Sequence, residues 1–233
     1  VTGSGRGIGK AIAAGFAAAG AHVWVHDKSI SDGEKTADEL SAHFIQADLC
    51  CSPNIDHLVE GLQREEGRLD ILVNNAGIEV IMPLEKLDFE RFDEIWQVNV
   101  RAAVELTHDL LPLLKASGSA SIINITSIHE LMPYPHNLSY SMSKSALSMF
   151  TKTIAVELAS YGIRANNLAP GAVMTQINRD VIEQIGQDNF RQWIPIGRVA
   201  TTEEIVGPAL FLASNASSYM TGSTLYVDGG YLQ

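Results

Sequence analysis

The chain has 233 residues, of which 46% are hydrophobic and 18% charged, and its formal net charge is −11. This composition excludes a disordered chain and has the size of one folded domain with a substantial core. The acidic residues are spread along the sequence, which argues against a nucleic-acid or anionic-membrane surface. No apolar run reaches the roughly 20 residues that span a bilayer.

The two cysteines, Cys50 and Cys51, are neighbours in the sequence. They are too close to form an ordinary disulfide with each other, and their spacing is not that of a metal site. We therefore expect a reducing cytoplasm, no bound metal, and a small-molecule substrate instead of a nucleic-acid or membrane partner.

A glycine-rich segment opens the chain, immediately before an alanine-rich helical pattern. The free N–H groups and the dipole at a helix start favour an anion, and glycines let the backbone approach a pyrophosphate closely. The glycine spacing departs from the tight G-x-G-x-x-G dinucleotide pattern. Such a loop normally follows a buried strand, so we expect an N-terminal strand to have been trimmed. The segment is Thr2-Gly3-Ser4-Gly5-Arg6-Gly7-Ile8-Gly9.

Apolar, β-branched runs alternate with helical patterns along the rest of the chain. The expected strands are His22–Asp27, His43–Asp48, Leu69–Ala76, Ser121–Ser127, Ile163–Leu168 and Thr224–Val227. The expected helices are Ile8–Ala19, Asp32–Ala42, Phe89–Lys115 with a bend near Pro112, Ser139–Tyr161, and one that begins near Thr202. Most of these strands are apolar on both faces, which is typical of a parallel sheet covered by helices on both sides. We predict an α/β Rossmann fold: a single domain over residues 1–233 with a doubly wound parallel sheet of about seven strands.

The segment Thr175–Gly197 is polar and lies between the fifth of these strands and the helix near Thr202. Insertions after a strand of an α/β sheet lie at the carboxyl edge, where ligands bind. We predict that this segment is a mobile flap over the substrate.

Asp27 ends the expected strand that follows the glycine loop. An acid about 20 residues after such a loop accepts hydrogen bonds from an adenosine ribose, and it repels a 2′-phosphate. Arg6 and Lys28 favour the opposite choice, because either base would pair with that phosphate. Repulsion in a partly dry pocket outweighs exposed ion pairs. We therefore expect NAD, with NADP as the alternative.

Tyr140 lies four residues before Lys144, one helical turn away, and Ser127 ends an apolar run upstream. A tyrosine has a pKa near 10, but a neighbouring ammonium and a cationic nicotinamide ring favour its phenolate. Ser127 would hold the substrate oxygen beside the Tyr140 hydroxyl while a hydride passes to or from the nicotinamide. These three side chains predict redox chemistry on a C–OH bond.

Several motifs occur together in the order found in short-chain dehydrogenase/reductases, and the chain resembles that family over its whole length. They are the glycine loop, Asn74-Asn75-Ala76-Gly77, Asn99, Ser127, Tyr140, Lys144 and Pro170-Gly171. The resemblance implies that Asn99 holds a water in a proton relay to Lys144. It further implies contacts to the cofactor from Asp48 and Leu49 at the adenine, Asn75, Ala76 and Gly77 at the adenosine, and Pro170, Gly171, Val173 and Thr175 at the nicotinamide or pyrophosphate.

His129 and Glu130 follow Ser127, and Asn178 lies at the start of the flap. This pattern resembles the glucose 1-dehydrogenase branch, so we expect these side chains to bond the hydroxyls of a sugar or polyol. The alternative is reduction of a 3-oxoacyl thioester or another ketone, although the acidic surface suits an acidic carrier protein poorly. A non-catalytic nucleotide-sensing protein is a third possibility.

Two of the expected helices, Phe89–Lys115 and Ser139–Tyr161, carry more apolar residues than one sheet face needs. Relatives in the family are commonly tetramers built through these helices and the last strand. We therefore expect a homotetramer with self-complementary two-fold interfaces.

Overall fold

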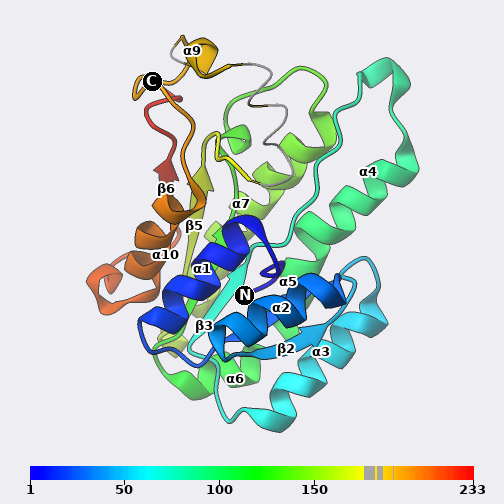
Figure 1. Cartoon of the computed structure of the whole chain (residues 1–233). Coiled ribbons are helices and arrows are strands. Elements are labelled where there is room, and N and C mark those ends of the chain that lie inside the picture. Colours follow the sequence, from blue (N-terminus) through cyan, green and yellow to red (C-terminus); the bar gives the residue numbers. More distant parts are fainter. Residues whose placement is uncertain (176–181, 183–185, 191) are drawn as a thin grey trace.

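The computed structural model describes residues 1–175, 182, 186–190 and 192–233. Its strands pair in parallel in two groups, in the orders β2-β1 and β3-β4-β5-β6. The strands are β1 (Trp24–Asp27), β2 (His43–Gln46), β3 (Ile71–Asn74), β4 (Ser121–Ile125), β5 (Arg164–Pro170) and β6 (Thr224–Val227). Each of the six expected strands is present, and the parallel α/β architecture is confirmed (Figure 1).

The first residues of the chain lie between the two strand groups. The amino group of Val1 donates to Trp24 O in β1 at 3.0 Å, and Thr2 N donates to Val73 O in β3 at 3.0 Å. A groove of about 440 Å³ continues along the facing edges and is lined by apolar side chains that include Leu58 and Leu72. The expected additional strand before Val1 stays a prediction.

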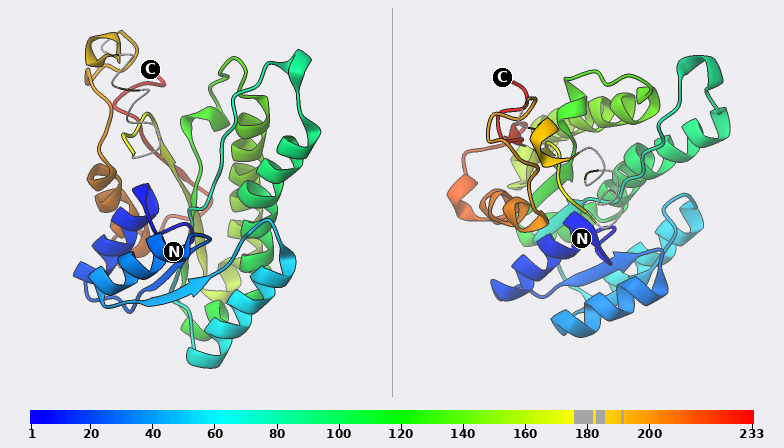
Figure 2. Two further views of the ribbon diagram at one scale, coloured as in Figure 1. Left: turned by 45° about the vertical axis from the view of Figure 1, so that its right-hand side comes forward. Right: turned by 45° about the horizontal axis from the view of Figure 1, so that its top comes forward.

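Helices cover the sheet on both faces, and Figure 2 shows the strands between the two helical layers. On one face, α1 and α10 bury Ile12, Phe16 and Leu212 against β3, β4 and β5. On the other, α3, α5, α6 and α7 bury Leu106 and Ile154 with their neighbours. The helices are α1 (Gly7–Ala18), α2 (Ile30–Leu40), α3 (Ser52–Glu65), α4 (Phe89–Trp96), α5 (Ala102–Asp109), α6 (Leu111–Ser117), α7 (Leu138–Leu158), α9 (Gln187–Phe190) and α10 (Val206–Ala213).

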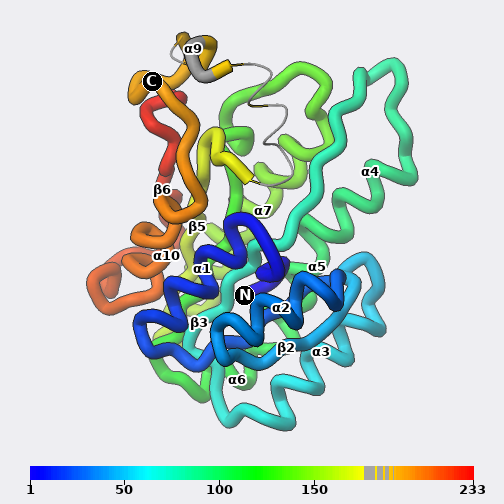
Figure 3. Tube along the Cα trace, in the orientation of Figure 1, coloured from blue at the N-terminus to red at the C-terminus, as the bar shows by residue number. Residues whose placement is uncertain are grey.

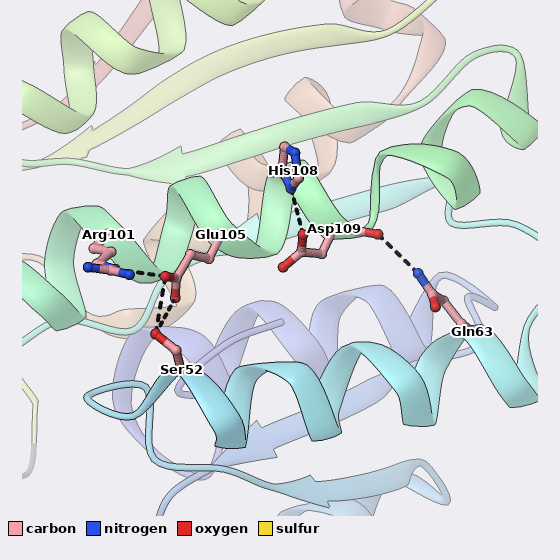
Figure 4. Close-up of polar contacts among 6 residues, drawn as sticks. All are labelled: Ser52, Gln63, Arg101, Glu105, His108 and Asp109. Carbon is pink, nitrogen blue, oxygen red and sulfur yellow. Dashed lines mark hydrogen bonds and ion pairs between the residues drawn. The ribbon is translucent and has the colours of Figure 1, made fainter.

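The structure adds α3, which was not among the expected helices. Figure 4 shows how α3 is attached to α5: Ser52 Oγ donates to Glu105 Oε1 at 3.1 Å, and Gln63 Nε2 donates to Asp109 O at 3.0 Å. Glu105 also accepts from Arg101 Nε at 2.7 Å. These polar contacts join α3 to α5, in addition to the apolar contacts between α3 and the sheet.

The expected helix over 89–115 is interrupted twice. A π-helical turn, Gln97–Arg101, separates α4 from α5, and a break at Leu110 precedes α6, where Pro112 occupies the first turn. Proline is accommodated at a helix start because it lacks an N–H that would be unpaired there. The break is therefore near the expected bend, while the π-helical turn was not expected. Separately, no helix among the described residues is long and apolar enough to cross a membrane.

Candidate active site

Ser127 lies just beyond the carboxyl end of β4, and that strand is buried on both faces. Its backbone is extended, and its Oγ accepts a hydrogen bond from His129 N at 3.2 Å. The serine thereby caps the short 3₁₀ turn Ile128–Glu130. This turn bends the chain away from the sheet and leaves the Ser127 hydroxyl at the carboxyl edge, where it also hydrogen-bonds Tyr140.

Tyr140 and Lys144 lie on the first turns of α7, on one side of the helix. Lys144 is buried, and its Nζ donates to Ile125 O, the last residue of β4, at 2.8 Å. Its Nζ is 5.5 Å from the centroid of the Tyr140 ring. A side chain four residues from another on a helix lies directly beside it. The structure therefore brings Ser127, Tyr140 and Lys144 together, as the sequence indicates.

Asn99 lies on the π-helical turn and is buried. Its side chain brackets Ile78: Oδ1 accepts from Ile78 N at 2.8 Å, and Nδ2 donates to Ile78 O at 2.9 Å. Nδ2 also donates to Ser143 Oγ on α7 at 3.0 Å. A π-helical turn reorients one side chain within a helix and often occurs at functional sites. Here it directs Asn99 toward α7, and the water relay from Asn99 to Lys144 stays a prediction.

Burial sets the proton affinities of the catalytic pair. It raises the pKa of Tyr140, the charge of Glu79 raises this pKa further, and the hydrogen bond from Ser127 partly lowers it. Burial lowers the pKa of Lys144 to about 8, against the opposing effect of Glu79 and Glu130. Without a cofactor, the pair at neutral pH is thus a neutral phenol beside an ammonium. The positive charge of an oxidised nicotinamide ring would favour the phenolate that oxidation of an alcohol requires.

The glycine loop is folded as an anion site at the start of α1. Gly3 and Gly7 have φ values of +60° and +58°, which favour glycine. A Cβ on Gly9 would lie 2.3 Å from Gly3 O, so a side chain is excluded there. The first turn of α1 carries no acidic residue, and Arg6 precedes it on the exposed surface. The helix dipole and the backbone N–H groups at the start of α1 therefore suit a phosphate.

Asp27 and His26, at the end of β1, hold this loop. Asp27 Oδ2 accepts from Gly5 N at 3.0 Å, and its Oδ1 accepts from Ser29 N at 2.9 Å. His26 Nδ1 accepts from Gly3 N at 3.2 Å, and its Nε2 lies 3.1 Å from Ala47 O. Because Nδ1 accepts, Nε2 carries the proton and donates to Ala47. Burial lowers the pKa of His26 to about 4, which keeps the ring neutral.

The remaining expected cofactor residues lie along the same edge. Asn75 Nδ2 donates to the backbone oxygens of Thr2 and Gly3, at 2.9 and 3.0 Å. Asp48 Oδ1 accepts from Cys50 N at 3.0 Å, which turns the chain after β2, and Leu49 is buried behind this turn. Ala76 N donates to the Thr2 hydroxyl at 3.0 Å, which ties the end of β3 to the loop.

The segment after β5 returns to the glycine loop. Gly171 N donates to Val227 O at 2.9 Å, and Val173 bridges to Ala200. A Cβ on Gly7 would lie 3.7 Å from Thr175 Cγ2, so Thr175 is beside the pyrophosphate loop although it is far away in the sequence. Figure 3 shows the chain after β5 passing close to the start of α1. This arrangement agrees with the expected contacts of Gly171, Val173 and Thr175, which stay predictions.

The predicted substrate residues have different environments. The His129 ring lies edge-on to the Tyr140 ring, with 6.3 Å between centroids, and its centroid is 5.5 Å from that of Tyr134. Glu130 faces β6 instead, where its Oε1 accepts from Tyr226 Oη at 2.8 Å. Asn178 lies outside the described residues, as do the other residues of 176–181, 183–185 and 191 in the predicted flap. Direct contact of His129, Glu130 or Asn178 with substrate stays a prediction.

Two side chains at this edge were not singled out from the sequence. Glu79 accepts a hydrogen bond from Asn137 Nδ2, and its charge acts on both Tyr140 and Lys144. His26 joins the glycine loop to the end of β2. The available signals were a carboxylate soon after a strand end and a histidine within an apolar strand. Neither signal is specific without the tertiary contacts.

These observations define the class of protein: an α/β oxidoreductase with a candidate dinucleotide site and a candidate Ser-Tyr-Lys catalytic group at the carboxyl edge of its sheet. Residues 3–232 match a family model described as "Enoyl-(Acyl carrier protein) reductase". The chain belongs to the short-chain dehydrogenase/reductase family, whose members transfer a hydride between NAD(P) and a CH–OH or C=O carbon.

Similar proteins of this family have different names. A 3beta-hydroxysteroid dehydrogenase 1 of Eggerthella lenta is 36% identical, over 99% of this chain and 91% of that protein. A glucose 1-dehydrogenase of Gluconobacter oxydans is 36% identical, over 99% and 90%. A 3-oxoacyl-[acyl-carrier-protein] reductase of Synechocystis sp. is 35% identical, over 99% and 94%. Identity alone therefore does not single out a substrate.

The fold is shared with solved structures over almost the full length. A putative gluconate dehydrogenase from Agrobacterium tumefaciens has a TM-score of 0.96 at 31% identity, covering 100% of this chain and 94% of that one. A gluconate 5-dehydrogenase from Burkholderia cenocepacia, in complex with NADP and tartrate, has a TM-score of 0.93 at 34% identity, covering 99% and 93%. The glycine loop, with its glycine-only geometry and uncapped helix start, fits a nicotinamide dinucleotide.

Proposed function

We propose that this protein oxidises a sugar or polyol to the corresponding lactone or ketone, with NAD as the hydride acceptor. The observation that carries this proposal is the position of His129, whose ring lies beside that of Tyr140 at the mouth of the catalytic group. A polar ring there offers a hydrogen bond to a hydroxyl next to the reacting carbon. The similarity to a glucose 1-dehydrogenase supports the same substrate class.

Each catalytic side chain has one task in this reaction. Ser127 orients the substrate oxygen, and Tyr140 accepts its proton during oxidation or donates one during reduction. Lys144 stabilises the phenolate form of Tyr140 by its charge, and Ile125 O holds the ammonium in place. Asn99 would order the water through which the proton reaches solvent. The bound dinucleotide supplies the hydride chemistry.

The preference for NAD rests on the carboxylate of Asp27. Its oxygens accept from Gly5 N and Ser29 N, which fixes the charge at the end of β1, where the adenosine ribose would lie. The solved relative with NADP shows that the family also binds the phosphorylated cofactor. The Kd values of this protein for NAD and NADP decide the matter, and a clear preference for NADP would contradict the proposal.

Reduction of a 3-oxoacyl thioester is the second candidate, and the similarity to a 3-oxoacyl carrier-protein reductase favours it. An acidic carrier protein would need a basic patch at the pocket mouth. Arg198 is one candidate for such a patch, but its Nη1 and Nη2 are paired with Glu204 at 2.7 and 2.8 Å. Arg179 and Arg191 lie outside the described residues. The described surface therefore supports a free small molecule.

The test is a panel of sugars, polyols, secondary alcohols and oxoacyl thioesters, followed at the nicotinamide absorbance with each cofactor. We expect turnover of at least one aldose or polyol with a higher kcat/KM than any thioester. If every sugar fails and a thioester reacts, the second candidate replaces the first.

We further propose that residues 1–233 act as one domain within a cytoplasmic homotetramer. Support for assembly comes from large apolar side chains exposed on α4 and α7: Phe89 is 71%, Met149 60% and Val156 81% exposed. These two helices lie beside each other on one side of the molecule (Figure 1). The free, exposed Cys50 and Cys51 agree with a reducing compartment. A monomer in light scattering would contradict the tetramer.

A further inference from the structure

The backbone of Glu79 is fixed next to the catalytic amine. Asn99 holds both backbone groups of the preceding residue, Ile78, at 2.8 and 2.9 Å. One residue earlier, a Cβ on Gly77 would lie 3.3 Å from Lys144 Nζ and 3.4 Å from Asn99 Oδ1. The segment 77–79, which ends at Glu79, therefore forms one wall of the active site, with Gly77 next to Lys144.

The carboxylate of Glu79 is held from the opposite wall. Asn137, which is fully buried, donates from Nδ2 to Glu79 Oε1 at 2.5 Å. Asn137 is the N-cap residue of α7 and lies three residues before Tyr140. The two walls are joined by Met82 N, which donates to His136 O at 2.6 Å. The start of a helix favours a negative charge, so the carboxylate is stabilised at the same helix end that presents Tyr140.

The charges around the catalytic pair are unequal. Glu79 and Glu130 both act on Lys144, and Glu79 acts on Tyr140. Among the described residues, His129 is a further titratable neighbour, and its Nδ1 is 3.1 Å from Met132 O. Two carboxylates therefore face one ammonium. Glu130 is turned toward Tyr226, whereas Glu79 is an exposed residue at the opening of the site.

We propose that the carboxylate of Glu79 selects uncharged substrates and rejects anionic ones, such as an aldonate or a dicarboxylate. This inference rests on the proposed function and narrows its substrate class to neutral aldoses and polyols. An anion placed beside Tyr140 would meet the negative charge of Glu79 across a partly solvated gap, where like charges repel. The same charge holds the proton on Tyr140.

The experiment compares the wild type with Glu79→Gln, which removes the charge and keeps an amide oxygen for Asn137. Tartrate is the anionic probe, and its Kd for the enzyme saturated with oxidised cofactor is measured by calorimetry at low salt. We expect Glu79→Gln to bind tartrate about tenfold more tightly than the wild type. The apparent pKa of the group that controls kcat/KM should fall in the same variant.

The matched control is Glu85→Gln, an exposed carboxylate on the short 3₁₀ turn Leu84–Lys86. It changes the net charge equally and should leave the tartrate Kd at the wild-type value. A second variant, Glu79→Ala, repeats the measurement if Glu79→Gln melts at a lower temperature than the wild type. Equal tartrate affinity in the wild type and in the folded Glu79 variants would overturn the inference.

Turnover measurements test the substrate class independently of the tartrate Kd. If the wild type turns over no sugar, the proposed function fails, while the tartrate measurement still reports on Glu79. If sugars react and a gluconate-type anion reacts equally well in the wild type, the inference fails and the proposed function stands. We expect the ratio of kcat/KM for a neutral sugar to that for its aldonate to fall about tenfold in Glu79→Gln.

Discussion

The cofactor half and the substrate half of the active site are built in different ways. Around the glycine loop, the contacts mainly join a backbone group to a side chain, such as Gly3 N to His26 Nδ1 and Gly5 N to Asp27 Oδ2. Around the substrate, the contacts join side chains that are distant in sequence, such as Asn137 to Glu79 and Tyr226 to Glu130. The two halves meet at α7, which carries Tyr140.

This difference predicts which half of the site tolerates amino-acid substitutions. The loop shape depends on positive φ at Gly3 and Gly7 and on the missing side chain of Gly9, so most substitutions there disrupt cofactor binding. The substrate half depends on side-chain pairs such as Glu79 with Asn137, which hydrogen-bond across 58 residues of sequence. A shared fold with several substrate classes follows from this arrangement.

Tyr140→Phe tests the junction of the two halves and should have the largest effect. It removes the proton donor and leaves the ring between Ser127 and Lys144, so we expect kcat to fall about 10³-fold. The Kd for NAD, measured by fluorescence, should remain within about twofold of the wild type. Unchanged turnover would instead support a nucleotide-sensing protein.

Sequence patterns were sufficient for the sheet and for the catalytic group. Strand positions follow from continuous apolar runs, and the spacing of Tyr140 and Lys144 on a helix makes them neighbours in any helical structure. Ser127 could be placed because a residue after a buried parallel strand lies at the carboxyl edge. These inferences depend on local periodicity, which a single sequence contains.

Tertiary contacts account for what the sequence did not predict. The π-helical turn that carries Asn99 has an ordinary helical composition, and it is defined by backbone hydrogen bonds of the i to i+5 type, for which the sequence has no spacing signal. Glu79 has no spacing signal, because its partner Asn137 is 58 residues away. The orientation of Glu130 toward β6 likewise depends on a contact across 96 residues, to Tyr226.

Asp27→Asn tests the cofactor half. It keeps the size of the side chain and removes the charge that would face a 2′-phosphate. We expect the ratio of the Kd for NADP to the Kd for NAD to fall about 30-fold, because charge repulsion at an effective dielectric near 20 is lost. Asp38→Asn, at an exposed position of α2, is the control. An unchanged ratio would show that other residues determine the preference between NAD and NADP.

Lys144→Met tests the energetic cost of the catalytic amine. Burial lowers the pKa of Lys144 from 10.5 to about 8, so between these values the unfolded chain binds more protons than the folded one. The wild-type free energy of unfolding should therefore rise with pH across that window, and the variant should lose this rise.

At pH 7, both folded and unfolded forms of the wild type are protonated, and the folded form carries the full cost of the buried ammonium. After allowance for the lost bond to Ile125 O, we expect Lys144→Met to raise the free energy of unfolding by about 2 kcal/mol while activity is lost. Urea denaturation measures both effects, and Lys152→Met, at an exposed position of the same helix, is the control. A destabilised Lys144→Met protein would show that the amine is a net stabiliser.

His26 variants separate its two contacts in the cofactor half. Asn retains an acceptor for Gly3 N, and Gln retains a donor for Ala47 O, whereas Leu removes both. We expect His26→Leu to weaken NAD binding about fivefold, His26→Asn to restore most of this affinity, and kcat to change little. Nitrogen NMR of the wild type should show the proton on Nε2 at pH 7. A proton on Nδ1 is incompatible with the contact to Gly3.

Tyr226→Phe has the smallest expected effect and probes the substrate half away from the catalytic hydroxyl. Burial and the Glu130 contact raise the pKa of Tyr226 to about 12, so at pH 7 the phenol donates to Glu130 Oε1. Thr224 Oγ1, at 3.3 Å from the same oxygen, remains in the variant. We expect a loss of about 1 kcal/mol in unfolding free energy and a KM for sugar within about twofold of the wild type. A large rise in KM at unchanged kcat would instead assign Glu130 to substrate binding. It would mean that substrate binds well only when Tyr226 holds the Glu130 carboxylate in position.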